Sequence, residues 1–378
     1  MPYLRPLAVL GFTALVAACD REPAGPEVLD PSDTAQTHGT LLARGHAPIY
    51  DHLAWIPGTE LVAFTSSSAG GFYVKTVDAA SGHVGVVDSA AGLQAPDGPY
   101  LRRLVAAPDG RALYYTVGIG DPRNPEWVLR AADPVGGGTS TLRSRVAPAL
   151  AVSPNGQQLA YVARGDSREY DSLIVRSLSS GSESYHGDYD GQNGDGGPIL
   201  FSPDGTELLY GQWVPLSWPL RRVALGDGTG QTITLPDGVV RAQLFHWGAS
   251  GIEALAEVSQ QYPSDYRVLT LSTGASVQVG ALRSGEGVPW EGWVSGFEAW
   301  STDGSRVAYW IGRCLQWSDL FDCGVARYAL YVADARTGTR TRVAYTGGGA
   351  GPTVFSPDGG RIVYHSPSTG EFYVVDVP

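Results

Sequence analysis

The stretch Phe201-Ser202-Pro203-Asp204-Gly205-Thr206-Glu207-Leu208-Leu209-Tyr210 returns later in the chain as Phe355-Ser356-Pro357-Asp358-Gly359-Gly360-Arg361-Ile362-Val363-Tyr364. In both copies an apolar run ends at Ser-Pro-Asp-Gly, and a second apolar run follows. Proline fixes φ near the value that a turn needs, and glycine tolerates positive φ, so these four residues favour a tight turn. Each copy therefore predicts a β-hairpin.

Five further copies of this turn occur along the chain at a regular interval. Three keep the proline or the Asp-Gly pair and cover residues 106–110, 152–156 and 300–304, and two degenerate copies cover residues 55–58 and 247–251. The turn glycines fall at positions 58, 110, 156, 205, 251, 304 and 359, which are 46 to 55 residues apart. These positions divide the chain into seven repeat units.

Each unit has room for four short strands. A second apolar strand follows the turn, as at residues 159–162 and 307–310, and a third strand runs into another turn at residues 73–82, 173–181, 266–274 and 331–338. Four antiparallel strands per unit of this length are typical of a propeller blade. We predict an all-β, seven-bladed β-propeller of four-stranded antiparallel blades over residues 40–378. The side chain before each turn is expected to pack between blades, at Trp55, Ala106, Val152, Phe201, Trp247, Trp300 and Phe355.

The two ends of this repeat region complement one another. The seventh unit reaches only its third strand, at residues 371–377, while residues 40–44 form a spare strand before the first unit. An open sheet edge promotes association with other chains. We therefore predict that the N-terminal strand completes the last blade and closes the ring.

Several Ser-Pro-Asp-Gly copies in register resemble the TolB-like propeller repeat, which is related in form to WD-repeat and prolyl-oligopeptidase propellers. The resemblance covers residues 40–378 and implies the propeller fold. TolB couples a six-bladed propeller to an N-terminal α/β domain, whereas seven units and no such domain are found here. The hydrolase domain of the peptidase relatives also has no counterpart in this sequence.

The first 39 residues have the character of a targeting segment and a tether. Arg5 precedes an apolar run over residues 6–18, which ends in Val16-Ala17-Ala18-Cys19 and resembles the bacterial lipoprotein signal. This resemblance implies a signal peptide over residues 1–18 and acylation of Cys19, with residues 19–39 as the acylated cysteine and a Pro-rich tether. An ordinary secretory signal with a chance cysteine is the alternative. The expected location is the bacterial cell envelope, lipid-anchored, on its periplasmic or extracellular side.

The composition excludes some partners and suggests no cofactor. With 26 Lys+Arg against 38 Asp+Glu, the net charge is −12, which argues against nucleic-acid binding. No Gly-x-Ser-x-Gly nucleophile motif occurs, since residues 292–296 place the serine one position late. No His-Glu-x-x-His or Cys-x-x-Cys pattern occurs either. The sequence thus points to no catalytic residue, metal or cofactor, although propellers can assemble sites from distant loops.

Aromatic residues are concentrated in one set of predicted connections. In a propeller, the connections between second and third strands and those between blades lie at the same end, and here these carry the insertions. We consider them a candidate binding face for an envelope protein, a peptide or a glycan. The alternative is that these aromatics only anchor large loops. The candidates are Tyr100, Tyr170, Trp213, Trp218, Tyr262, Trp290, Trp293, Trp317 and Phe321.

Two further motifs allow alternative interpretations. Cys314 and Cys323 both fall in a predicted loop of the sixth unit, residues 310–327, and in an oxidising compartment we expect them to form a disulfide. Free or metal-binding thiols are the alternative. Asp188, Asp190 and Asp195 suggest calcium by their alternating oxygens, but the stretch departs from the twelve-residue calcium loop and fits a solvated turn better.

Three functions remain open from the sequence. The first is a membrane-tethered, monomeric binding or scaffold propeller that touches the membrane only through its lipid anchor. The second is a propeller-type lyase or hydrolase acting on a glycan or peptide. The third is a structural role in assembly of the envelope.

Overall fold

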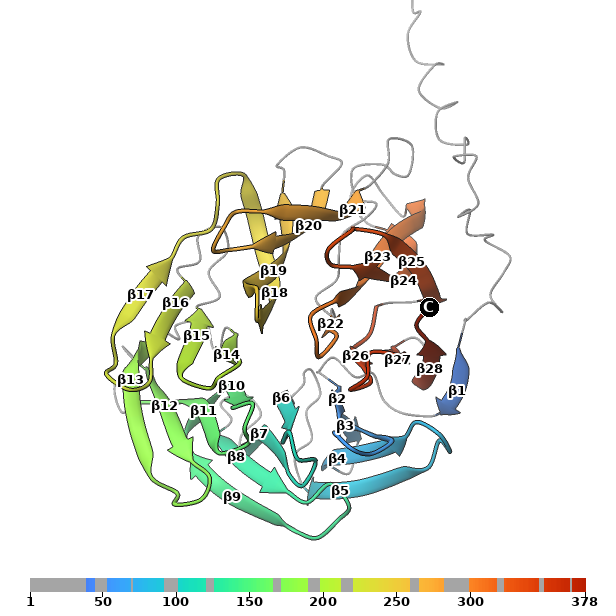
Figure 1. Ribbon diagram of the computed structural model, residues 1–378. Coiled ribbons are helices and arrows are strands. Elements are labelled where there is room, and N and C mark those ends of the chain that lie inside the picture. The colour runs from blue at the N-terminus through green and yellow to red at the C-terminus, as the bar shows by residue number, and fades with distance from the viewer. Residues whose placement is uncertain are drawn as a thin grey trace, which may run out of the picture.

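Seven small sheets are arranged radially around a common centre in the computed structural model (Figure 1). The structure describes residues 39–44, 53–68, 71–91, 101–119, 126–165, 171–189, 198–211, 220–258, 265–281, 299–317, 323–346, 350–367 and 369–378. Within these ranges, 28 strands form seven four-stranded antiparallel sheets, and no helix occurs, so none that could span a membrane. The predicted seven-bladed β-propeller is confirmed.

In each blade the strands follow the chain from the inner edge, near the centre of the ring, outward. Blade 1 contains β2 (Ala54–Trp55), β3 (Leu61–Ser68), β4 (Gly71–Asp78) and β5 (Val84–Ala91). Blade 2 contains β6 (Leu101–Ala106), β7 (Leu113–Ile119), β8 (Glu126–Ala132) and β9 (Thr139–Ser144). Blade 3 contains β10 (Val146–Val152), β11 (Gln158–Ala163), β12 (Asp171–Ser177) and β13 (Glu183–Tyr189).

The remaining blades repeat this order. Blade 4 contains β14 (Ile199–Phe201), β15 (Glu207–Gly211), β16 (Leu220–Ala224) and β17 (Gly230–Ile233). Blade 5 contains β18 (Val239–Gly248), β19 (Gly251–Val258), β20 (Asp265–Thr270) and β21 (Ser276–Ala281). Blade 6 contains β22 (Ala299–Trp300), β23 (Arg306–Trp317), β24 (Cys323–Asp334) and β25 (Arg340–Thr346). Blade 7 contains β26 (Thr353–Phe355), β27 (Arg361–Ser366), β28 (Glu371–Asp376) and, on its outer edge, β1 (Thr40–Ala43).

Local hydrogen bonds explain why the repeated motif forms its turn. The Ser202 hydroxyl donates to Asp204 Oδ1 over 2.6 Å and accepts the backbone N–H of Glu207 over 2.9 Å. Asp204 Oδ1 also accepts the N–H of Thr206 at 3.0 Å. These hydrogen bonds lower the pKa of Asp204 to about 2, and the bond from the Ser202 hydroxyl has the largest effect. The same arrangement recurs in the turns that begin at Ser153, Ser301 and Ser356.

In the turn of blade 1, the glycine lies one position earlier than in the repeated motif. Gly58 has a φ of 74° and occupies the position of the motif aspartate, because Thr59, not Gly58, donates its N–H to the first turn residue, Ile56. The Thr59 hydroxyl takes over the local bonding by donating to the Ile56 carbonyl at 2.9 Å and accepting the Leu61 N–H at 3.0 Å. A Pro-Gly turn therefore replaces the motif turn.

Buried clusters lie between neighbouring blades, and the side chains before the turns contribute to them. Trp55, Phe201 and Phe355 are buried, while the other four predicted positions are partly buried and pack against such clusters. The predicted role of these positions between blades is thus confirmed. Among the described residues, the largest fully buried side chain is Trp310 of blade 6, whose ring meets that of Tyr364 in blade 7 edge-on at 5.6 Å. Its indole N–H donates to the Gly351 carbonyl at 2.9 Å.

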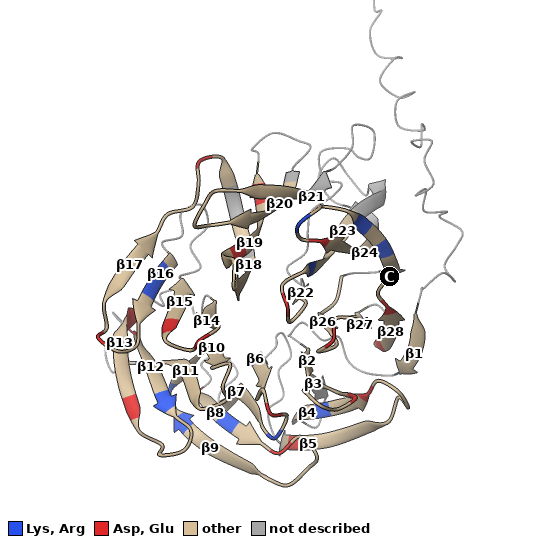
Figure 2. Cartoon of the chain, in the orientation of Figure 1, with Lys and Arg blue, Asp and Glu red and all other residues tan. Residues whose placement is uncertain are grey.

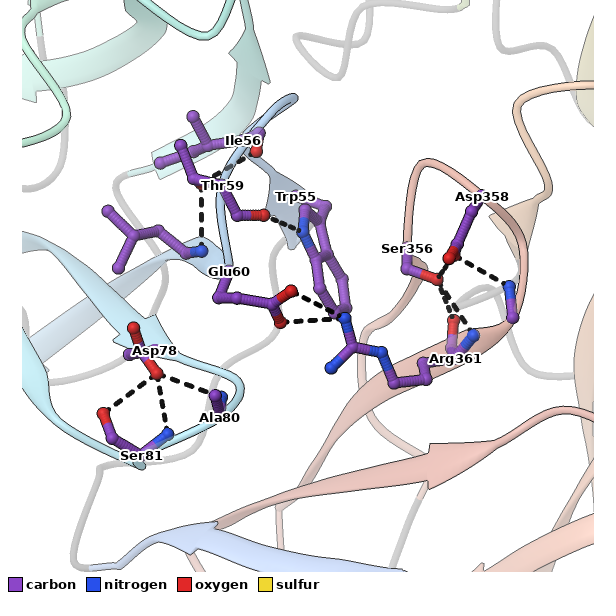
Figure 3. Close-up of polar contacts among 12 residues, drawn as sticks. Trp55, Ile56, Thr59, Glu60, Asp78, Ala80, Ser81, Ser356, Asp358 and Arg361 are labelled. Carbon is purple, nitrogen blue, oxygen red and sulfur yellow. Dashed lines mark hydrogen bonds and ion pairs between the residues drawn. The ribbon is translucent and has the colours of Figure 1, made fainter.

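Strand β1 closes the ring as predicted. It pairs antiparallel with β28, with Thr40 opposite Val374 and Ala43 opposite Phe372, and the two strands lie side by side in Figure 1. Across the seam between blades 7 and 1, Arg361 Nη2 donates to both carboxylate oxygens of Glu60 at 2.9 and 2.8 Å (Figure 3). The same guanidinium lies 5.2 Å from the centre of the Trp55 ring. Backbone pairing and side-chain contacts therefore both join the ends of the ring.

The predicted long loop of the sixth unit is wrong for most of its length. Residues 310–317 and 323–327 belong to β23 and β24, which continue the hairpin outward with Gly312 opposite Tyr328 and Arg313 opposite Arg327. Only residues 318–322 lie outside the described strands. Each of these two strands has 12 residues. The extension was not predicted, because the apolar pattern is interrupted in this segment although cross-strand pairing continues through it.

Candidate functional site

The strand order defines two ends of the propeller with different connections. The turn face carries the connections from the first to the second and from the third to the fourth strand of each blade, such as residues 202–206 and 225–229. The loop face carries the connections from the second to the third strand and from one blade to the next. From residue 45 on, every segment outside the described residues belongs to loop-face connections. The connections that differ most in length, from Arg145 alone to residues 282–298, therefore lie at the loop face.

The predicted aromatic candidates all belong to loop-face connections or their margins. Trp317 is the last residue of β23, and its side chain is outside the description. The other candidates lie outside the described residues: Tyr100, Tyr170, Trp213, Trp218, Tyr262, Trp290, Trp293 and Phe321. The proposed binding role of these residues stays a prediction.

The described residues at the bases of two of these connections are fixed by a direct contact. Tyr189, the last residue before segment 190–197, is 1 % exposed, and its hydroxyl donates to the carbonyl of Gly211 at 3.1 Å. Gly211 is the last residue before segment 212–219, which carries Trp213 and Trp218. The Tyr189 ring also packs 6.2 Å from that of Tyr210. Blades 3 and 4 thus hold the starting points of both segments in one position.

A second set of contacts of this kind lies where blade 2 joins blade 3. Arg145 alone connects β9 to β10 and has a φ of 57°, which non-glycine residues adopt rarely. Its carbonyl accepts the N–H of Arg164 at 2.8 Å, and its Nη2 donates to the Gly165 carbonyl at 3.0 Å. Beyond segment 166–170, burial raises the pKa of Asp171, an effect that the charge of Arg164 opposes. Charged groups therefore lie at both ends of the connection that carries Tyr170.

Many turns of the turn face contain an aspartate whose carboxylate serves the fold. Each of the eight aspartates named below accepts at least one backbone N–H of its own turn. Acidic residues are distributed around the ring in Figure 2. These carboxylates therefore stabilise turns, as in Asp78, Asp109, Asp133, Asp204, Asp227, Asp303, Asp334 and Asp358.

The acidic stretch considered for calcium is only partly described. Asp188 lies in β13 and accepts a hydrogen bond from the Tyr185 hydroxyl at 2.5 Å, whereas Asp190 and Asp195 lie outside the described residues. Among the residues that the structure describes, no group of three or more His, Cys, Asp or Glu side chains is arranged to hold a metal ion.

The backbone of the sixth blade places both cysteines in one hairpin. Cys314 lies opposite Ala326, and Cys323 lies opposite Trp317. Their side chains are outside the description, so the disulfide stays a prediction. The register offsets the two cysteines by three positions along the hairpin, so a bridge requires this end of the hairpin to shift. If the chain lies in an oxidising compartment, as its first 19 residues predict, we expect thiol labelling of the unreduced, denatured protein to find neither cysteine reactive. Two labelled thiols would show that no bridge forms.

Comparisons with solved structures identify propellers over most of the chain. An oligogalacturonate lyase from Vibrio parahaemolyticus is 12 % identical, with 90 % of this chain and 93 % of that chain covered and a TM-score of 0.61. The C-terminal WD40 domain of Sif2 is 11 % identical, with 90 % and 98 % covered and a TM-score of 0.56. TolB from Acinetobacter baumannii is 15 % identical, with 83 % and 79 % covered and a TM-score of 0.47. Neither a protein-family model nor a curated protein sequence matches the chain. At these identities the first two likenesses establish a shared fold.

Proposed function

We propose that the chain is a membrane-tethered, extracytoplasmic binding module of the bacterial envelope that holds a partner protein or peptide on its loop face. The direction of β1 carries this proposal. Thr40 lies opposite Val374, near the Asp376 end of β28. Asp376 in turn lies opposite Arg361, the first residue after a turn of the turn face, so this end of β28 is its turn-face end. Arg44 lies at the other end, where its Nε is 3.1 Å from Glu371. The chain thus enters the ring at the turn face.

This entry point separates the anchor from the binding surface. A lipid on Cys19 would be joined through residues 20–38 to the turn-face end of β1, and the loop face lies at the opposite end of every blade. The loop-face connections then begin at the end of the ring opposite the point of attachment. The fixed bases at Tyr189 and Arg145 support the same role, since rigid attachment lowers the entropy cost of ordering a loop when a partner binds.

The anchoring and the binding are tested with one set of variants. Full-length wild-type protein is expected in the membrane fraction, and Cys19→Ser in the soluble fraction, because only the cysteine thiol accepts the lipid. In capture from envelope extracts, Trp213→Ala with Trp218→Ala is expected to lose a partner that wild type retains. Val135→Ser, which alters a 77 % exposed side chain on the turn face, is the matched control and should retain that partner.

The two parts of this proposal fail separately. A wild-type protein with a free, unacylated N-terminus contradicts the anchor and leaves the binding face standing. A partner retained equally by the loop-face and turn-face variants contradicts the binding face.

A further inference from the structure

The turn-face end of blade 4 contains a hollow of about 340 Å³. Arg222 lies opposite Gln231 in the register of β16 and β17, and Glu207 lies opposite Ala224 in the register of β15 and β16. Because alternate residues of a strand share a face, Arg222 and Ala224 point to the same side of the sheet. The lining consists of Glu207, Arg222, Ala224, Thr229, Gly230 and Gln231.

A fixed ion pair forms one wall of this hollow. Arg222 Nε donates to Glu207 Oε1 at 3.0 Å, and Arg222 Nη2 donates to Glu207 Oε2 (β15 red and β16 blue in Figure 2). The guanidinium also lies 5.5 Å from the centre of the Trp247 ring in blade 5. Bidentate pairing and this cation–π contact restrict both side chains to one arrangement. The wall is therefore preorganised.

Hydrogen-bonding capacity remains in the hollow after these contacts. Within the described residues, Arg222 Nη1 has no hydrogen-bond partner, and neither has the exposed side-chain amide of Gln231. The Glu207 oxygens retain acceptor positions, since a carboxylate has about four lone-pair sites. A donor, a combined donor and acceptor, and an acceptor thus line one small space.

The charges of this hollow select the kind of ligand. The positive charge of Arg222 is neutralised by Glu207, and Asp227, which accepts the Thr229 hydroxyl at 2.7 Å, adds a negative charge beside the lining. An anionic ligand would be repelled, and a strong cation would compete with Arg222 for Glu207. A neutral ligand with several hydroxyl groups can bond to all three side chains and leave the ion pair intact.

We propose that the hollow of blade 4 binds one sugar unit of a neutral saccharide. A volume of about 340 Å³ is near the lower end of ligand pockets, which suits one sugar ring better than a long oligosaccharide. The hollow is at the turn face and shares no residue with the loop-face candidates. This saccharide site is therefore independent of the partner protein proposed above.

Ligand-observed NMR with the full chain tests this site. Galactose and N-acetylglucosamine are the neutral probes, and galacturonate is the anionic counterpart of galactose. At least one neutral sugar is expected to bind in the millimolar range, and galacturonate at least tenfold more weakly than galactose if galactose is that sugar. Gln231→Ala is expected to weaken binding about fivefold or more, because it removes hydrogen bonds to the ligand.

The control variant comes from the next blade. Gln278 lies opposite Arg267 in blade 5, as Gln231 lies opposite Arg222, and Gln278→Ala should leave sugar binding unchanged. Both variants alter exposed side chains, and equal melting temperatures confirm that they fold. Absence of binding by both neutral sugars, galacturonate binding as tightly as galactose, or an equal effect of the two variants would each overturn the proposal.

Discussion

Replacing Trp310 with alanine is expected to lower the free energy of unfolding by about 3–5 kcal/mol, the range for large buried aromatic residues. The Trp310 ring is fully buried between blades 6 and 7, where it meets Tyr364 edge-on. Its N–H donates to the carbonyl of Gly351 and, over 3.0 Å, to the Thr353 hydroxyl. Alanine would leave a cavity and remove the donor to both oxygens. Urea unfolding followed by circular dichroism measures the loss.

Trp310→Phe separates the two contributions to this loss. Phenylalanine retains most of the apolar volume but cannot donate a hydrogen bond, so we expect a smaller loss of about 1–3 kcal/mol. If Trp310→Ala costs less than about 1 kcal/mol, the contact between blades 6 and 7 does not have the role assigned to it.

Deleting residues 39–44 is expected to open the ring and cause self-association. The deletion removes β1 from β28 and takes Leu42 and Ala43 away from the cluster that contains Trp55 and Phe372. Lost backbone hydrogen bonds and apolar contacts together should lower the free energy of unfolding by about 3 kcal/mol or more. The exposed edge of β28 would then be free to pair with another chain. Size-exclusion chromatography with light scattering, together with urea unfolding, measures both effects.

A deletion of residues 20–37 is the control, because it shortens the tether and keeps β1. This variant should remain as stable and as dispersed as the wild type. An unchanged urea midpoint and mass after deletion of residues 39–44 would show that β1 contributes nothing to closure.

The sequence predicted the turns and the closure because their causes are local or countable. The bonds that form the Ser202 turn all lie within five residues, so their pattern is visible in the amino-acid order. Closure followed from a third strand without a fourth and a spare strand before the first unit. The earlier position of Gly58 in its turn was not predicted, because the Thr59 hydroxyl forms the local hydrogen bonds that the motif serine and aspartate form in other turns.

Two other features could not be predicted from short-range patterns. The extension of β23 and β24 depends on pairing such as that of Arg313 with Arg327, which interrupts the apolar alternation used to recognise strands. The hollow of blade 4 depends on Arg222 reaching Trp247 in the next blade. Glu207 and Arg222 are 15 residues apart, and nothing in that spacing indicates that they pair. Both features arise from tertiary contacts.

The pairing of β1 with β28 also sets the order in which the protein is completed. Thr40 and Val374 are neighbours in the sheet but are 374 − 40 = 334 positions apart in the chain. During synthesis β1 emerges long before its partner strand. Contacts of such long range form slowly, because the ends of a long chain must meet before they gain any stabilisation. A nascent chain therefore cannot close the ring until β28 has been made, and a product that stops before β28 leaves β1 without its partner strand.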